Sequence, residues 1–330
     1  MLRYTIRRVI MVVPVVLGVM LIVFLFQAIS KEDPAAELLG PGATPQEMDQ
    51  KREELGLNDP IVIQYARYVW NFVSKGDLGT SYSSGRPVIN DLINRYPVTI
   101  RLALSAVMLA VIIGIPLGVI SAVKQYTLVD SGVLAFAVAA ASIPNFWFGL
   151  MLISLFSVRL RWLPSIGISS SLGWIMPTIV VMVNAMANFI RNTRSSMLES
   201  IRQDYVRMAR AKGLRETTVI IRHAFRNSLI PIINIIGNAL GIQLGGALIV
   251  ETVFGLPGIG KYAIDSISTR NFPAVRGSVV LLAITFTLVN LFVDLIFTVA
   301  DPRIKTALYG ARKKKAPAPV VKVGGAKADG

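Results

Sequence analysis

Six long apolar stretches, separated by polar segments, most constrain how this 330-residue chain can fold. A helix needs about 20 residues, at ~1.5 Å each, to cross roughly 30 Å of hydrocarbon. Five of the stretches are clearly long enough, and the shorter fourth one has Pro177 near its start, where a helix tolerates proline. The sequence predicts an all-α integral membrane protein with six transmembrane helices, at residues 9–29, 98–123, 132–158, 174–190, 229–253 and 278–300.

The overall composition supports a membrane location. Hydrophobic residues make up 53% of the chain and charged residues only 16%, whereas soluble domains carry about 25% charged residues. The 34 lysines and arginines exceed the 19 aspartates and glutamates, which gives a net charge of +15. Nucleic-acid-binding proteins can show such an excess, but the basic cytoplasmic loops of a membrane protein explain it at least as well. We expect membrane lipid, and no nucleic acid, around this chain.

Two residue types are scarce enough to exclude several kinds of chemistry. The chain has no cysteine and a single histidine, His223. Disulfide bonds, thiolate metal sites and cysteine nucleophiles are therefore excluded, and no histidine pair is available for a metal ion or for acid–base catalysis. We expect no enzymatic activity, no metal and no cofactor.

Arginine and lysine set the orientation of the predicted helices. An inner N-terminus places Arg3, Arg7, Arg8 and the basic segment 191–226 on the cytoplasmic side, where positive residues are enriched. Both termini are then cytoplasmic. The first apolar stretch follows three arginines, as in a secretory signal peptide, but it is longer than the apolar region of 7–15 residues in a cleavable signal. We interpret it as a retained anchor.

The polar segments divide the chain into four parts. Residues 1–29 form the N-terminal anchor helix, and residues 30–97 form an extracytoplasmic insert with a helical apolar stripe. Residues 98–300 form a core of five transmembrane helices, with an inner loop at 191–228 and an outer loop at 254–277. The basic tail, 301–330, lacks the apolar residues needed for a core and is expected to be disordered.

The inner loop has the pattern of two helices joined by a glycine. Gly213 lies where a first helix would end, because glycine accepts the left-handed backbone conformation without a Cβ clash. A second short helix is expected from Glu216 to Phe225. A partner that gripped this second helix would move both adjoining spans; the alternative is an ordinary basic loop that only sets topology. The apolar side chains expected to share one face of the first helix are Met197, Ile201, Tyr205 and Met208.

The same loop resembles that of a known family. The run Asp204-Tyr-Val-Arg-Met-Ala-Arg-Ala-Lys-Gly-Leu-Arg-Glu, continuing to Asn227-Ser-Leu-Ile-Pro231, is similar to the cytoplasmic coupling (EAA) loop of ABC-importer permeases. It departs from the wider pattern, because the glutamate and the first alanine are missing and the proline lies 18 residues after Gly213. Both departures resemble the dipeptide/oligopeptide/nickel group, as does the run from Gly76 to Tyr82.

The resemblance implies a fold and a set of partners. It implies the type I importer (MetI-like) permease fold, with an N-terminal extracytoplasmic insert that marks a B-type subunit, in the cytoplasmic (inner) membrane of a bacterium or archaeon. The implied partners are a second homologous permease, two cytoplasmic ABC ATPase subunits and an extracytoplasmic substrate-binding protein. The residues implied to couple to the ATPase are Asp204, Tyr205, Arg207, Ala209, Arg210, Ala211, Lys212, Gly213, Leu214 and Glu216.

The outer loop nearly spells a phosphate-binding P-loop. The run from Gly255 to Lys261 lacks the serine or threonine that must follow the lysine, because Tyr262 stands there, and a membrane span rather than a strand precedes it. We interpret it as a tight turn at the outer mouth of the pathway. Asparagines spaced by four residues on two spans either line this pathway or join the helices. The candidate pathway or gate residues are Asn184, Asn188, Asn234, Asn238, Glu251, Phe254 and Pro257.

The best-supported function is that of a permease subunit of an ATP-driven importer, with di- or oligopeptides as the expected substrate. A self-sufficient secondary transporter is the alternative, but the spans lack buried acidic residues for ion coupling and show no evident inverted repeat. An intramembrane hydrolase lacks a nucleophile–base pair. Peptides, nickel chelates and glutathione remain open as substrates within the family.

Overall fold

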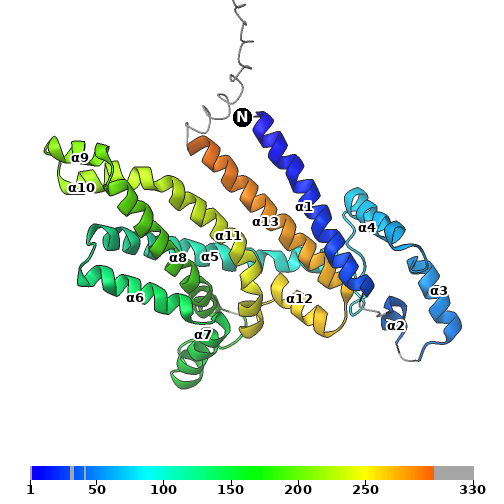
Figure 1. The fold of residues 1–330 in the computed structure, drawn as a ribbon. Helices are drawn as coiled ribbons and strands as arrows, with labels where there is room; N and C mark the ends of the chain where they lie inside the picture. Colours follow the sequence, from blue (N-terminus) through cyan, green and yellow to red (C-terminus); the bar gives the residue numbers. More distant parts are fainter. Residues whose placement is uncertain (1, 30–32, 41, 169, 301–330) are drawn as a thin grey trace, which may run out of the picture.

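The computed structural model describes residues 2–29, 33–40, 42–168 and 170–300. These residues are almost entirely helical, and the predicted disordered tail lies outside them (Figure 1). The elements in chain order are α1 (Leu2–Ile29), α2 (Pro34–Leu39), α3 (Pro45–Leu55), α4 (Ile61–Lys75), α5 (Val88–Val123), α6 (Leu128–Ser142), α7 (Asn145–Leu152), the π-helix η1 (Ile153–Arg159), the 3-10 helix η2 (Ser171–Trp174), α8 (Ile175–Ile201), α9 (Asp204–Ala211), α10 (Glu216–Thr218), the π-helix η3 (Val219–Phe225), α11 (Arg226–Val253), α12 (Ile259–Ser268) and α13 (Phe272–Ala300).

The predicted all-α membrane architecture is confirmed. Within the described residues, five helical segments are long and apolar enough to cross a membrane, and a bent pair makes a sixth if it counts as one span. The five segments are Val9–Ile29, Val88–Val123, Ser171–Ile201, Glu216–Gly245 and Phe272–Leu295.

The third predicted span, 132–158, is not a single helix. The helical segments Leu128–Ser142 and Asn145–Arg159 meet at an angle of 96°. Pro144 causes the break, because proline disfavours helical geometry in the residue before it. Ile143 is extended there, with φ −83° and ψ 122°.

The second and fourth helices extend furthest beyond their predicted spans. The second helix begins at Val88 and continues through Pro97. Its first turns are held in place because Val88 and Leu92 are buried in a cluster with side chains of α4, α12 and α13. The fourth helix continues beyond its apolar stretch to Ile201, as expected from the helix predicted over Met197 and Ile201. Each extension carries a span beyond its apolar stretch into a packed polar region.

Two glycines allow α5 and α8 to approach closely. A Cβ added at Gly114 would lie 3.0 Å from the Met186 carbonyl oxygen, and one at Gly118 would lie 2.7 Å from Thr193 Cβ. Small residues four positions apart let helix backbones pack against each other in a membrane, where burial from water supplies no driving force. The largest core cluster forms around this crossing.

A second glycine pair serves α11 in the same way. A Cβ at Gly237 would lie 2.3 Å from Val293 Cγ1, and one at Gly241 would lie 2.7 Å from the Phe286 ring, so both glycines seat side chains of α13. Helix α13 in turn packs along α1. These contacts connect the anchor helix to the core.

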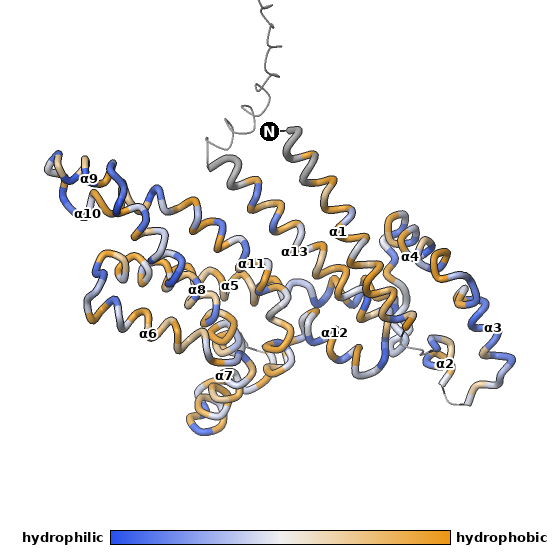
Figure 2. The backbone as a smooth tube through the Cα atoms, viewed as in Figure 1, coloured by the Kyte–Doolittle hydropathy of each residue, from blue (hydrophilic) through white to orange (hydrophobic). Residues whose placement is uncertain are grey.

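Within the predicted insert 30–97, the described residues before α5 form α2, α3 and α4, of which α4 lies against α1. Thr44 and Glu47 make a capping box at the start of α3. Helix α4 contacts α1 through Tyr65, whose hydroxyl donates to the Leu17 carbonyl oxygen at 2.8 Å. Figure 2 shows hydrophobic residues along much of α4, whereas α3 is largely hydrophilic.

The α5–α8 contact makes a stability prediction. We expect Gly118→Ala to destabilise the protein by about 1–3 kcal/mol, as overpacking does, because its Cβ would lie 2.8 Å from the Ile190 carbonyl oxygen. The matched control is Gly132→Ala in α6, where nothing lies within 4 Å of the added Cβ. Thermal denaturation in detergent measures both; an equal midpoint for the two variants would contradict the close approach.

Candidate functional site

The first candidate site is the elbow formed by α9, Gly213 and α10. Helix α8 ends at Ile201, and α9 begins at Asp204 after a short break. Gly213 has φ +73°, which confirms the predicted left-handed position. Its N–H donates to the Arg210 carbonyl oxygen at 2.9 Å, and the Leu214 N–H donates to the Ala209 carbonyl oxygen at 3.4 Å. The chain therefore turns sharply at this glycine.

The second helix of the elbow continues into the membrane core. The predicted helix over 216–225 is present as α10 and the π-helix η3, which lead without a break into α11. Arg210 forms a bidentate ion pair with Glu216, with N–O distances of 3.1 and 2.6 Å. These bonds to Glu216 raise the pKa of Arg210. The pair holds α9 and α10 together across the turn.

The predicted apolar face of α9 is wrong. Tyr205 and Met208 are exposed, whereas Val206 and Ala209 are buried. The break before Asp204 changes the register, so the stripe of α8 does not continue along α9. The buried cluster beneath the elbow consists of Ala122, Met197, Val206, Ala209, Val219, Ile220 and Ala224.

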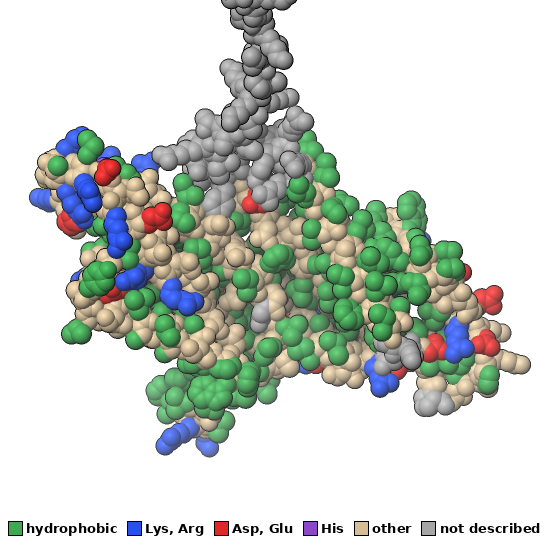
Figure 3. Space-filling view, in the orientation of Figure 1, with side chains coloured by type: hydrophobic (Ala, Val, Ile, Leu, Met, Phe, Trp, Pro, Cys, Tyr) green, Lys and Arg blue, Asp and Glu red, His purple; other side chains and the backbone are tan. Residues whose placement is uncertain are grey.

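The exposed side of the elbow combines positive charge with apolar side chains. Figure 3 shows lysine and arginine side chains gathered over α9 and α10, at the upper left. Met208 is 63% exposed and Ile221 is 67% exposed beside them. Nine of the ten predicted coupling residues are exposed here, and only Ala209 is buried. Such a surface can bind a partner with an apolar groove and acidic rim.

Two buried polar contacts, missed by the sequence analysis, join α8 to neighbouring helices near the elbow. Arg194 of α8 binds Asp130 of α6 through two N–O contacts of 2.7 and 2.8 Å. Asp130 is 3% exposed and also accepts from the Ser121 hydroxyl at 2.6 Å. Nearer the elbow, the Ser228 hydroxyl lies 2.8 Å from that of Ser200. Asp130 could have been singled out in the sequence, because it lies three residues after Thr127, which caps α6, and at the edge of an apolar run.

The second candidate region is the glycine-rich outer loop. Glu251 is fully buried and accepts hydrogen bonds from the Thr99 hydroxyl at 2.6 Å and from the Lys261 N–H at 3.0 Å. A Cβ added at Gly258 would lie 2.3 Å from its carboxylate. The loop that resembles a P-loop thus encloses an internal carboxylate at the start of α12, where helices bind anions.

The other predicted gate residues differ in exposure. Phe254 is 2% exposed and packs over Gly149, whose added Cβ would lie 3.1 Å from the ring. Pro257 is exposed. The three gate residues therefore lie together, but Glu251 and Phe254 are structural parts of the loop rather than solvent-facing side chains.

The four asparagines do not form one network. Asn184 donates to the Asn145 side-chain oxygen at 2.6 Å, and Asn188 accepts from Asn192 at 2.6 Å. Asn234 and Asn238 lie exposed on α11. Among the described residues, no hydrogen bond joins the asparagines of α8 to those of α11.

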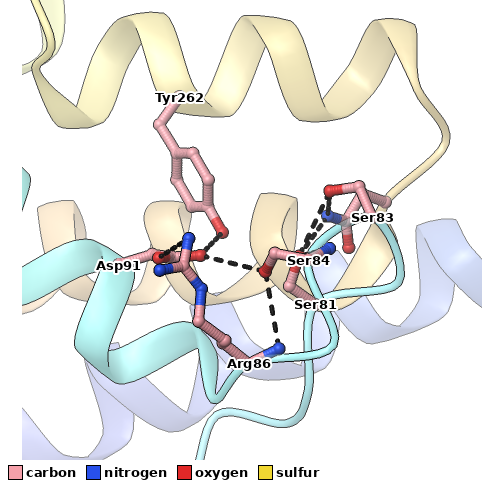
Figure 4. A network of polar contacts seen from close by, with 7 residues as sticks. Ser81, Ser83, Ser84, Arg86, Asp91 and Tyr262 are labelled. Carbon is pink, nitrogen blue, oxygen red and sulfur yellow. Dashed lines mark hydrogen bonds and ion pairs between the residues drawn. The ribbon is translucent and has the colours of Figure 1, made fainter.

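A polar network ties the insert loop to α12 (Figure 4). The Tyr262 hydroxyl donates to Asp91 at 3.1 Å, and Arg86 lies 3.5 Å from the same carboxylate. Burial and the neighbouring Asp91 raise the pKa of Tyr262 to about 12, so its proton stays on to donate. Beside it, Asn271 donates to the Ser81 and Ser83 hydroxyls. The network fixes the outer loop against the insert.

The described residues offer no group of three His, Asp or Glu side chains placed to hold a metal ion. What they do present is a rigid elbow at one end of the spans and a braced loop at the other. This arrangement is suited to transmitting movement along helices and carries no assembled catalytic set.

Comparisons with known proteins agree with this reading. The model for "Binding-protein-dependent transport system inner membrane component" matches residues 114–306, and the model for its N-terminal part matches residues 1–103. A Brucella abortus (strain 2308) protein, named as a permease of a peptide transport system, is 38% identical over 307 residues, covering 91% of this chain and 98% of the relative.

Two further comparisons bear on substrate and fold. The glutathione transport system permease protein GsiC of Escherichia coli (strain K12) is 37% identical over 305 residues, covering 92% of this chain and 99% of the relative. A solved structure of the MetNI methionine ABC transporter matches with a TM-score of 0.56 at 19% identity, covering 63% of this chain and 95% of that one. The structural match supports the predicted MetI-like permease fold.

The Glu251 cradle makes a second stability prediction. Glu251→Gln keeps the shape but replaces one acceptor oxygen with an NH₂ group, which cannot accept from Thr99 or Lys261. We expect a loss of about 1–3 kcal/mol, the cost of a buried donor left unsatisfied. The control is Glu53→Gln, on an exposed position of α3. Denaturation midpoints in detergent that coincide for the two variants would contradict the structural role of Glu251.

Proposed function

We propose a substrate and a coupling mechanism for this chain, which belongs to the family of binding-protein-dependent transport system inner membrane components. Membership makes it a permease subunit of an ABC importer, of peptide or glutathione type, without an ATPase domain of its own. Within that class, the proposed substrate is a di- or oligopeptide. The proposed partners are a second homologous permease, two cytoplasmic ABC ATPase subunits and an extracytoplasmic binding protein.

The exposed elbow is the observation that carries the coupling proposal. Its surface residues are free to meet an ATPase, while Val206, Val219 and Ala224 pack beneath it in one cluster with Met197 of α8. Because η3 runs directly into α11, a force on the elbow reaches α8 and α11 together. The elbow therefore acts as the transmission element between ATP hydrolysis and the spans.

An exposed stripe along α11 supports the proposal of a second permease. Asn234, Asn238 and Ile242 follow one another on one face and are exposed. Polar side chains in a span face protein or a watery pathway rather than lipid. We assign this stripe to the pathway formed with the second permease.

The relatives favour two related substrates. The Brucella relative is named for peptide transport, and the Escherichia coli relative for glutathione transport. Short peptides are the first proposal, and glutathione, which is itself a small peptide-like molecule, is the second candidate. The extracytoplasmic binding protein supplies most of the choice between them.

Copurification and transport test this proposal. We expect the chain, purified in mild detergent from its native membrane, to bring an ATPase and a second permease, identified by mass spectrometry. Proteoliposomes of that complex, given its binding protein, should take up labelled dipeptides only with internal ATP. Uptake of glutathione in place of dipeptides would select the second candidate. ATP-independent uptake by the chain alone would overturn the importer mechanism in favour of a secondary transporter.

Substitutions of Gly213 test the elbow. Gly213→Val places a β-branched residue at φ +73°, a strain of about 1–3 kcal/mol. We expect lower peptide uptake per ATP hydrolysed, because valine would push residue 213 out of the left-handed conformation and displace α10 relative to α9. Nothing lies within 4 Å of the added Cβ, so a clash does not contribute. Gly213→Asn is the control, because asparagine tolerates the left-handed region. Wild-type coupling in the valine variant would remove the elbow from the mechanism.

A further inference from the structure

Helix α4 of the insert exposes an apolar face. Val62 is 78% exposed, Trp70 68% and Val73 69%, and Ile63 is 49% exposed beside them. With the exposed Ala66, these residues recur at helical spacing and cover one side of the helix. We call them the α4 face. A contiguous apolar surface that carries a tryptophan marks a site of interaction.

The rest of α4 is already occupied. Tyr65, Tyr68, Val69 and Phe72 pack inward with α1, α12 and α13, where the Phe24 ring lies 5.6 Å from that of Tyr65. The narrow polar side carries Gln64, Arg67 and Asn71 and lines a cavity of about 440 Å³ shared with α2 and α13. The α4 face therefore points away from both the protein core and the polar cavity.

The α4 face adjoins the surface of α1. Only 11% of the apolar window of α1 is buried, and Ile22, Phe26 and Ile29 are 55%, 72% and 73% exposed toward its outer end. Figure 3 shows hydrophobic side chains gathered over both α1 and α4 on the right of the molecule. Among the five candidate spans α1 is the least buried, so its exposed apolar side is available to lipid, and α4 continues this apolar surface.

We propose that α4 is an interfacial helix whose apolar face lies in the phospholipid on the extracytoplasmic surface of the cytoplasmic membrane. Amphipathic helices of this kind sink their apolar side about 5–10 Å into the headgroup and acyl boundary. Tryptophan favours this depth. The bilayer thus holds the insert, together with the network of Tyr262 and Asp91, at a fixed depth relative to the membrane surface.

Spin labels can test the environment of the α4 face. The natural chain has no cysteine, so single-cysteine variants need no background changes. Val73→Cys places a nitroxide on the face, and Ser74→Cys places one on the neighbouring polar side as a matched control. Both are measured in the copurified complex, in nanodiscs of phosphatidylcholine and phosphatidylglycerol, with oxygen as the lipid-soluble relaxing agent and a nickel chelate as the aqueous one.

The proposal predicts opposite results at these adjacent positions. At Val73→Cys the ratio of oxygen to nickel-chelate accessibility should be severalfold higher than at Ser74→Cys. Equal aqueous accessibility at both positions would overturn the proposal, because the face would lie in water. Protection of Val73→Cys from both agents would also overturn it, because a protein subunit would cover the face. Val62→Cys repeats the measurement if Val73→Cys disturbs the fold. The result does not depend on the transported substrate.

Discussion

The close approach of α5 and α8 at Gly114 and Gly118 is the contact on which the rest of the core depends. In a bilayer, apolar helices gain little from meeting each other unless their surfaces fit tightly. Without side chains at these two positions, the Met186 and Ile190 carbonyl oxygens come within about 3 Å of where a Cβ would stand. The crossing sets the position of α8, so Arg194 meets Asp130 at the end of α8 nearer the elbow. The elbow is built on that same helix.

Glycines and carboxylates have different roles at the two ends of the helix bundle. At the elbow, a left-handed glycine and an exposed ion pair leave a surface available to a partner. At the outer loop, glycines make room for the Glu251 carboxylate, which caps α12 from a different helix. The resemblance to a P-loop has a physical basis, since backbone N–H groups at a helix start attract an anion. Here the acceptor is a carboxyl group of the chain itself.

Much of the fold and part of the candidate site could be predicted from the sequence. The spans, the left-handed Gly213 and the short second helix depend on local properties, namely apolar length and backbone preference, and the structure agrees with them. The buried face of α9 and the straight third span were wrong. Both errors came from extending a helical period across a break, at Arg202 and Gln203 in one case and at Pro144 in the other. The Asp130–Arg194 pair joins residues 64 apart in sequence; a local pattern could single out Asp130, but it could not show that Arg194 is its partner.

The sequence by itself determined that this chain crosses a membrane several times and carries a basic elbow between two spans. Both can be predicted locally, because hydrocarbon thickness sets the length of a continuous apolar run and the conformational freedom of glycine acts at a single position. Only the tertiary structure decided which polar residues are exposed: Glu251, predicted to line a pathway, is buried, and Asn234 and Asn238 remain accessible. It also decided that α4 turns its polar side toward a cavity and leaves its apolar side open beside α1. Those outcomes depend on which helices pack together, and packing is fixed by fit between distant segments rather than by the residues within any one of them.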